Sequence, residues 1–168
     1  MAAQRELKKP TSAIVGDKLV LSPTYVSNGH WCVPRTWMPV THRTDDALKT
    51  LATRGVRILE MDDESVARVM AKPASVTTWE VSAVRLAAGP CPKASVVLVT
   101  DGALAVIDAR YADWLGLAPG DTVEGSPDGR GPFFLADGAV VTPLRFKALD
   151  LLRGIVGRAD KKPEAVTA

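Results

Sequence analysis

The chain has 168 residues, of which 46% are hydrophobic and 24% are charged, with 21 basic and 19 acidic side chains. This length is typical of one domain, and the composition is that of a folded globular protein, which excludes a largely disordered chain. The formal net charge of +2 excludes a strongly basic nucleic-acid coat and a strongly acidic DNA mimic. The apolar runs are too short to cross a bilayer, and the first ten residues lack the apolar stretch of a secretory signal. We therefore expect a cytoplasmic protein with no membrane association.

The N-terminal third predicts a polar arm followed by short strands. Residues 1–17 are mostly polar, which favours an arm attached loosely to the domain. Strand composition is found at residues 18–22, 25–26 and 30–33. Pro23 has no N–H to donate, so it argues against a central position in the sheet for the first of these strands.

Acidic residues mark the starts of two predicted helices. Thr44 can cap the first, which Gly55 ends. The second begins at Asp62, where a carboxylate suits the positive end of the helix dipole, and it ends before Pro73. A short strand over residues 56–59 lies between them.

The C-terminal half predicts two β-hairpins with the same turn. Asp101-Gly102 joins apolar runs at 95–100 and 103–108, and Asp137-Gly138 joins runs at 132–136 and 139–142. Two apolar runs joined by Asp-Gly are typical of a hairpin. A strand over 76–86 precedes them, and further helices are expected over 110–117 and 146–156.

These elements predict an α+β fold, mainly an antiparallel sheet with Asp-Gly hairpins and three or four short helices. We expect a single domain over residues 18–157. Residues 158–168 are polar and predict a flexible C-terminal tail.

The possible metal ligands are His30, Cys32, His42 and Cys91. Their number suits a zinc site, but they do not form two closely spaced pairs. Cys32 with His42 supplies the residue types of a cysteine hydrolase, but nothing nearby would lower the thiol pKa, such as a helix that starts at the cysteine. The alternative is that Cys32 is buried as a small apolar group.

The sequence contains neither a Walker A loop nor a GxGxxG motif. The string at residues 128–132, DGRGP, is glycine-rich, but it leads into a predicted strand. It therefore lacks the helix N-terminus on which phosphate loops depend. We expect no metal, no cofactor and no enzymatic activity.

Two tryptophans flank an arginine in the segment Trp31, Arg35 and Trp37. Aromatic and arginine side chains are common anchors of protein interfaces, and they also stack on bases. This pattern makes the three residues candidates for binding a protein partner. The alternative is that the tryptophans close one end of the core, because large aromatic side chains are mostly buried.

Basic side chains gather near the C-terminus. Residues 145–162 hold six basic residues against two acidic ones. A basic helix can contact the phosphates of double-stranded DNA, and the alternative is a solvated helix face. The candidates for DNA contact are Arg153, Arg158, Lys161 and Lys162.

Residues 103–146 resemble the closing part of a bacterial DNA sliding-clamp domain (the polymerase III beta family). There, a strand leads into a short helix with an aromatic residue and a leucine, matched here by Tyr111 and Leu115. Further strands end in a V-V-x-P-x-R-hydrophobic signature, matched here by Val140, Val141, Pro143, Arg145 and Phe146. This chain departs from the family in having room for one such domain instead of three, in Thr142 in place of methionine, and in continuing past the signature.

The resemblance implies a small domain of two sheets with two helices packed inside, several copies of which would form a ring around DNA. It also implies basic inner helices and a hydrophobic pocket that recruits partners. The sequence therefore predicts a non-enzymatic, sliding-clamp-like accessory of DNA replication or assembly module that forms homo-oligomers. The alternative is a small protein-binding or structural accessory, viral or from a mobile element, with no nucleic-acid role. A cysteine hydrolase ranks third.

Overall fold

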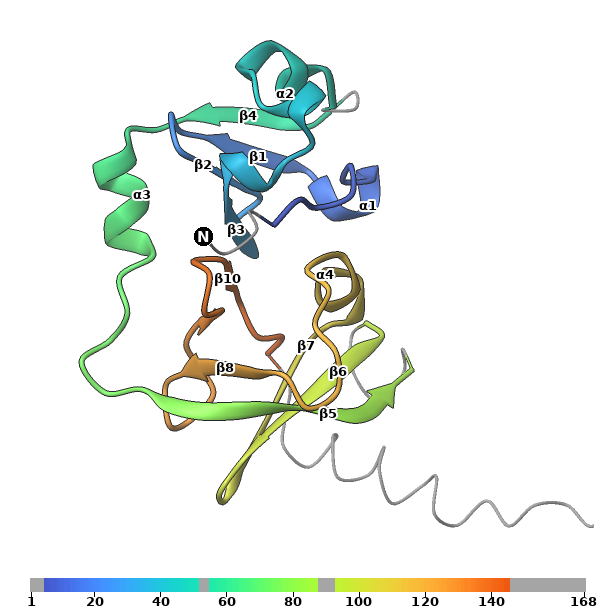
Figure 1. Ribbon diagram of the computed structural model, residues 1–168, viewed down its shortest axis with the longest axis vertical. Coiled ribbons are helices and arrows are strands. Elements are labelled where there is room, and N and C mark those ends of the chain that lie inside the picture. Colours follow the sequence, from blue (N-terminus) through green and yellow to red (C-terminus); the bar gives the residue numbers. More distant parts are fainter. Residues whose placement is uncertain (1–4, 52–54, 88–92, 146–168) are drawn as a thin grey trace, which may run out of the picture.

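The computed structural model describes residues 5–51, 55–87 and 93–145. Ten strands of the described chain form one sheet in the order β4-β1-β2-β3-β10-β9-β8-β5-β6-β7. Figure 1 shows β1, β2 and β4 near one end of the molecule and β5 to β8 near the other. The strands are β1 (Lys18–Leu21), β2 (Tyr25–Ser27), β3 (Trp31–Pro34), β4 (Arg57–Glu60), β5 (Thr77–Leu86), β6 (Ser95–Thr100), β7 (Ala103–Asp108), β8 (Thr122–Gly125), β9 (Phe133–Phe134) and β10 (Val140–Val141). Every strand pair in these ranges is antiparallel except β1 with β4.

The described chain also contains four short α-helices and two single turns of 3-10 helix. The helices are α1 (Ser12–Val15), α2 (Asp45–Leu51), α3 (Asp63–Val69) and α4 (Ala109–Trp114), and the 3-10 turns are η1 (Arg35–Trp37) and η2 (Val40–His42). The prediction of one mixed α+β domain, with a mainly antiparallel sheet and three or four short helices, is confirmed. The helix expected over 146–156 and the tail expected over 158–168 lie outside the described residues.

The two halves of the chain share this sheet. They join where β3 pairs with β10, with Cys32 opposite Val140 and Trp31 opposite Val141. The sliding-clamp resemblance implies two sheets, whereas the described strands are joined into one. Beyond β10, the Leu144 N–H donates to the carbonyl of Val106 at 2.8 Å. This bond brings the segment that follows β10 alongside β7, which is the last strand in the sheet order.

Large aromatic side chains form part of the hydrophobic core. Trp31, Trp79 and Phe133 are almost fully buried. The Trp31 indole N–H donates to the Ile14 carbonyl at 2.9 Å, which satisfies its one polar atom. Trp79 and Phe133 pack edge to face with ring centroids 5.4 Å apart, an arrangement that aromatic pairs prefer.

Helix α4 is anchored at its start by a buried carboxylate. Asp108 accepts a hydrogen bond from the Arg110 N–H at 2.9 Å and from the Arg110 guanidinium at 2.7 Å. Burial raises the pKa of Asp108, but the hydrogen bonds from Arg110 outweigh it and hold the pKa below its usual value. The helix then packs Tyr111 and Leu115 into the core.

The N-terminal segment differs from the expected loose arm. Leu7, Ile14 and Val15 are buried, and the Leu7 N–H donates to the Trp37 carbonyl at 2.7 Å. Asn28 also donates to the Ile14 carbonyl, at 2.9 Å. The described part of residues 1–17 is thus packed against the domain, because its few apolar side chains have a place in the core.

Candidate functional site

The predicted partner surface at Trp31, Arg35 and Trp37 is not on the outside of the described fold. Trp31 is 1% exposed and Trp37 is 4% exposed, so both indole rings belong to the core. Arg35 lies on η1, and its guanidinium contacts the Asp45 carboxylate at 2.6 Å. The alternative interpretation, in which large aromatic residues are buried, therefore describes these tryptophans.

Cys32 is buried beside β10. Burial raises the pKa of its thiol to about 12, against a smaller opposing effect of the Ser27 hydroxyl. At neutral pH this sulfur is a thiol, and only a thiolate is an effective nucleophile. The burial of Cys32 is what the alternative interpretation, a small apolar group in the core, predicts.

The other candidate ligands and DNA contacts are dispersed or lie beyond the described residues. The His30 ring stacks on Tyr111 with centroids 6.2 Å apart, and His42 contacts the Thr41 hydroxyl at 2.8 Å. Within the described ranges, no three His, Cys, Asp or Glu side chains group to hold a metal ion. Outside those ranges lie Cys91, Arg153, Arg158, Lys161 and Lys162.

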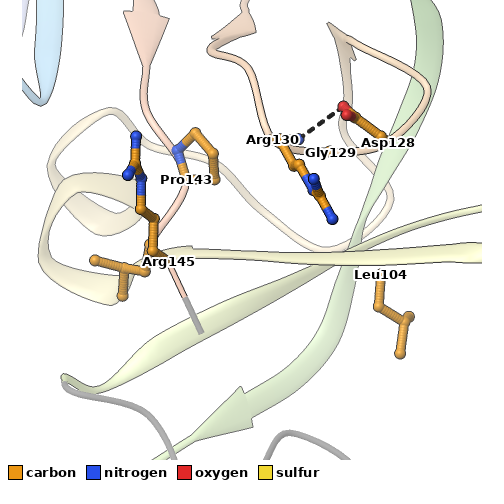
Figure 2. A pocket seen from close by; sticks show the side chains of 7 residues that line it. Leu104, Asp128, Gly129, Arg130, Pro143 and Arg145 are labelled. Atoms are coloured by element: carbon orange, nitrogen blue, oxygen red, sulfur yellow. Dashed lines mark hydrogen bonds between the residues drawn. The ribbon is translucent and has the colours of Figure 1, made fainter. Parts of the chain in front are cut away.

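A groove with two arginines lies beside β7 (Figure 2). It is an open cavity of about 620 Å³. We call it the cationic groove, and its lining is Leu104, Asp128, Gly129, Arg130, Pro143, Leu144 and Arg145. Both arginines are exposed, and neither forms an ion pair with a carboxylate in the described parts of the chain.

This lack of an ion pair distinguishes Arg130 and Arg145 from most of the described arginines. Five others each contact an aspartate or glutamate: Arg5, Arg35, Arg68, Arg85 and Arg110. The guanidinium groups in the cationic groove thus keep their donors available for an anionic ligand.

The loop over residues 126–131 forms one wall of the groove and rests on the core. Gly129 has a φ of +66°, and a Cβ at this position would lie 2.8 Å from Cη2 of Trp79. The Trp79 indole N–H also donates to the Ser126 carbonyl at 3.2 Å. The close approach of the Gly129 backbone to the Trp79 indole limits how near the loop can lie to the core. The same loop contains Arg130, which lines the groove.

Asp128 stabilises the same loop from within. Its carboxylate accepts the Arg130 N–H at 3.0 Å and the Ser126 hydroxyl at 2.7 Å. These hydrogen bonds hold the pKa of Asp128 below its usual value. The carboxylate is therefore ionised at neutral pH, and it accepts both hydrogen bonds from within its own loop.

A second, apolar groove lies between α3 and the β9–β10 connection. Its volume is about 230 Å³. We call it the apolar groove, and its lining is Tyr25, Ala67, Met70, Lys72, Phe134, Leu135, Gly138, Ala139 and Val140. The Lys72 ammonium lies 5.9 Å from the centre of the Phe134 ring and also forms an ion pair with Glu124. This groove could receive a small apolar side chain.

Sequence reasoning missed both grooves. The glycine-rich string at 128–132 leads into β9, a strand, as the sequence predicts. The available signal was Arg130 itself, an arginine between two glycines, where a tight turn would expose its side chain. No local signal connects Arg130 to Leu104 or Arg145.

Comparisons of the chain with protein-family models, with curated proteins and with solved structures find no match. In the described part of the chain, no helix has the length and apolar character needed to span a bilayer.

Proposed function

We propose that the protein is a non-catalytic, sliding-clamp-like accessory of DNA replication that forms homo-oligomers and binds double-stranded DNA. The observation that carries this proposal is the cationic groove, in which the guanidinium groups of Arg130 and Arg145 form no ion pair with a carboxylate among the described residues. Arg145 is also the first of the six basic residues within 145–162. The groove thus lies where the most basic part of the sequence begins.

The distribution of charge supports a polyanionic partner. Residues 145–162 contain six of the chain's 21 basic residues and only two of its 19 acidic residues. The net charge of the whole chain is close to zero, so this basic region is a local feature. Binding through such a region releases counterions from DNA and is therefore sensitive to salt.

The order of elements supports the sliding-clamp resemblance. Strand β7 leads directly into α4, which contains Tyr111 and is followed by Leu115, and both side chains are buried. Strands β8 to β10 follow, and Val140 and Val141 are the two residues of β10. The proposal is supported by this order of elements, with Tyr111 in α4 and the valine pair in β10.

The test is solution mass by light scattering, with and without a short DNA duplex at low and moderate salt. We expect a homo-oligomer whose duplex affinity falls steeply as salt rises. Neutralising the four C-terminal candidates to glutamine should weaken binding: Arg153, Arg158, Lys161 and Lys162. Arg68→Gln is the control, because Arg68 is exposed on α3 and already paired with Glu64. A monomer that is indifferent to DNA would refute the proposal.

A second candidate function is a protein-binding accessory without a nucleic-acid role, and the apolar groove favours it. This alternative predicts a monomer indifferent to DNA that captures a protein partner. Met70→Asp should then abolish capture, because Met70 lines the groove. Val69→Asp should not, because Val69 is 75% exposed on the same helix and does not line the groove. Equal capture by both variants would exclude the apolar groove as the docking site.

A further inference from the structure

We propose that the cationic groove is a phosphate site, in which the exposed guanidinium groups of Arg130 and Arg145 each bind a phosphate of the DNA backbone. This inference rests on the proposed function and names the place where the duplex backbone would contact the folded domain. It requires no helix N-terminus, since the ligands are guanidinium groups.

The chemistry of the two arginines suits a phosphodiester. A guanidinium donates paired N–H groups in a planar fork that matches two phosphate oxygens, and its charge makes these hydrogen bonds strong. Leu104 and Leu144 line the same groove and add apolar surface beside the two charges. Neither arginine has to leave a carboxylate of the described chain to bind the anion.

Three consecutive N–H groups of the 126–131 loop already have acceptors within the loop. The N–H of Gly129 donates to the Ser126 carbonyl at 2.9 Å, and that of Gly131 donates to the Ser126 hydroxyl at 3.1 Å. The Arg130 N–H donates to Asp128. These three amides are therefore not available to an anion, and the bond to Asp128 holds the Arg130 backbone in place.

Asp128 also lines the groove, and its charge must be considered. Figure 2 shows its carboxylate bonded to the Arg130 backbone and on the far side of Arg130 from Arg145. In this view the carboxylate thus does not stand between the two guanidinium groups. Two guanidinium charges against one carboxylate leave the groove lining with a net positive charge.

The first experiment measures the salt dependence of duplex binding by fluorescence anisotropy, using two labelled duplexes of unrelated sequence. For Arg130→Gln and Arg145→Gln, we expect weaker binding to both duplexes and a slope of log affinity against log salt reduced by about 1 for each variant. Arg130→Lys should keep the wild-type slope, because the charge remains. Arg57→Gln is the control, since Arg57 is exposed on β4, at the opposite end of the sheet order.

The second experiment replaces DNA by inorganic tripolyphosphate and follows the backbone amide signals by NMR. We expect saturable shifts at Arg130 and Arg145 in the wild type, and none in the Arg130→Gln Arg145→Gln double variant. Circular dichroism and urea midpoints close to those of the wild type show that the variants are folded.

The outcomes separate this site from the proposed function. If the wild type binds duplex and both glutamine variants keep its salt slope, the cationic groove is not the phosphate site, while the proposed function stands. If tripolyphosphate binds in the groove but duplex does not, the proposed function is refuted and the site is one for free phosphates. If neither ligand binds, both proposals are refuted.

Discussion

Replacing Gly129 by alanine tests whether contact with Trp79 holds the 126–131 loop. A Cβ at residue 129 would lie 2.8 Å from Cη2 of Trp79 and 3.1 Å from Cβ of Ala105. Side chains do not approach this closely, so either the loop or the indole must move. The backbone φ of +66° adds strain, since a residue with a Cβ, such as alanine, is unfavourable in the left-handed region of backbone conformation.

The loss of stability in Gly129→Ala has two contributions, backbone strain and overpacking, and comparison with Gly102→Ala separates them. Gly102 has a φ of +78°, but a Cβ there would meet no atom within 4 Å. It should therefore show only the backbone strain, about 1 to 2 kcal/mol. Gly129→Ala should add the overpacking of a core contact, about 1 to 3 kcal/mol. The expected difference between the two variants is thus about 1 to 3 kcal/mol, a large part of a total stability of about 5 to 15 kcal/mol.

The assay is urea unfolding followed by tryptophan fluorescence, with the free energy of unfolding compared between the two variants and the wild type. Trp79→Phe removes the ring atoms nearest to residue 129, so combining it with Gly129→Ala should recover part of the loss. Equal destabilisation by Gly129→Ala and Gly102→Ala would refute the reasoning. It would mean that the indole does not limit the position of the loop.

Three further predictions concern buried and charged groups. In a Cys91→Ser background, iodoacetamide should modify Cys32 slowly at pH 8 and rapidly after unfolding, because burial raises its pKa to about 12; rapid modification of the folded protein would contradict the burial. The pKa of Asp128 is lowered in the fold, so its stabilising effect is present above its unfolded pKa of about 3.9 and is lost as pH falls through the lower folded pKa. Urea midpoints of wild type and Asp128→Asn should accordingly differ at pH 7 and converge in acid, and a constant difference would exclude this linkage. Trp31→Ala should cost about 3 to 5 kcal/mol in the same unfolding assay, because Trp31 is buried and hydrogen-bonded; a cost below 1 kcal/mol would show that its surroundings collapse around the gap.

The elements with strong local signals were predictable. The start of α3 follows from Asp62, whose carboxylate accepts the Ser65 N–H at 2.7 Å as a capping residue does. The apolar runs at 95–100 and 103–108 form β6 and β7, with Thr100 opposite Ala103. In both cases, a stretch of only a few residues contains the interaction that defines the element.

The elements that depend on distant pairing were missed or misjudged. Strand β8 has one buried apolar side chain, Val123, and its main partner is β5, about 45 residues earlier in the chain. The expectation that Pro23 keeps its strand out of the centre was wrong, because β1 ends at Leu21 and pairs with both β2 and β4. Pro23 lies beyond the last paired residue, so its missing N–H costs no ladder bond.

The cationic groove shows the same limit for function. Its two arginines are 15 positions apart in the sequence, and both line the groove because separate contacts place their segments there. The Leu144 N–H bond to Val106 holds the segment before Arg145, and Trp79 supports the loop before Arg130. Neither contact has a signature in the residues next to the arginines.

The two contacts also make the groove dependent on the core of the domain. Phosphates held by the two arginines bind more tightly when both are preorganised, because less conformational entropy is lost on binding. Gly129 lines the groove but has no side chain with which to bind an anion. If Trp79 limits the position of the loop, Gly129→Ala should lower the affinity for duplex but leave the salt slope unchanged, because both arginine charges remain. Gly102→Ala, in a turn outside the groove lining, should leave both the affinity and the slope unchanged.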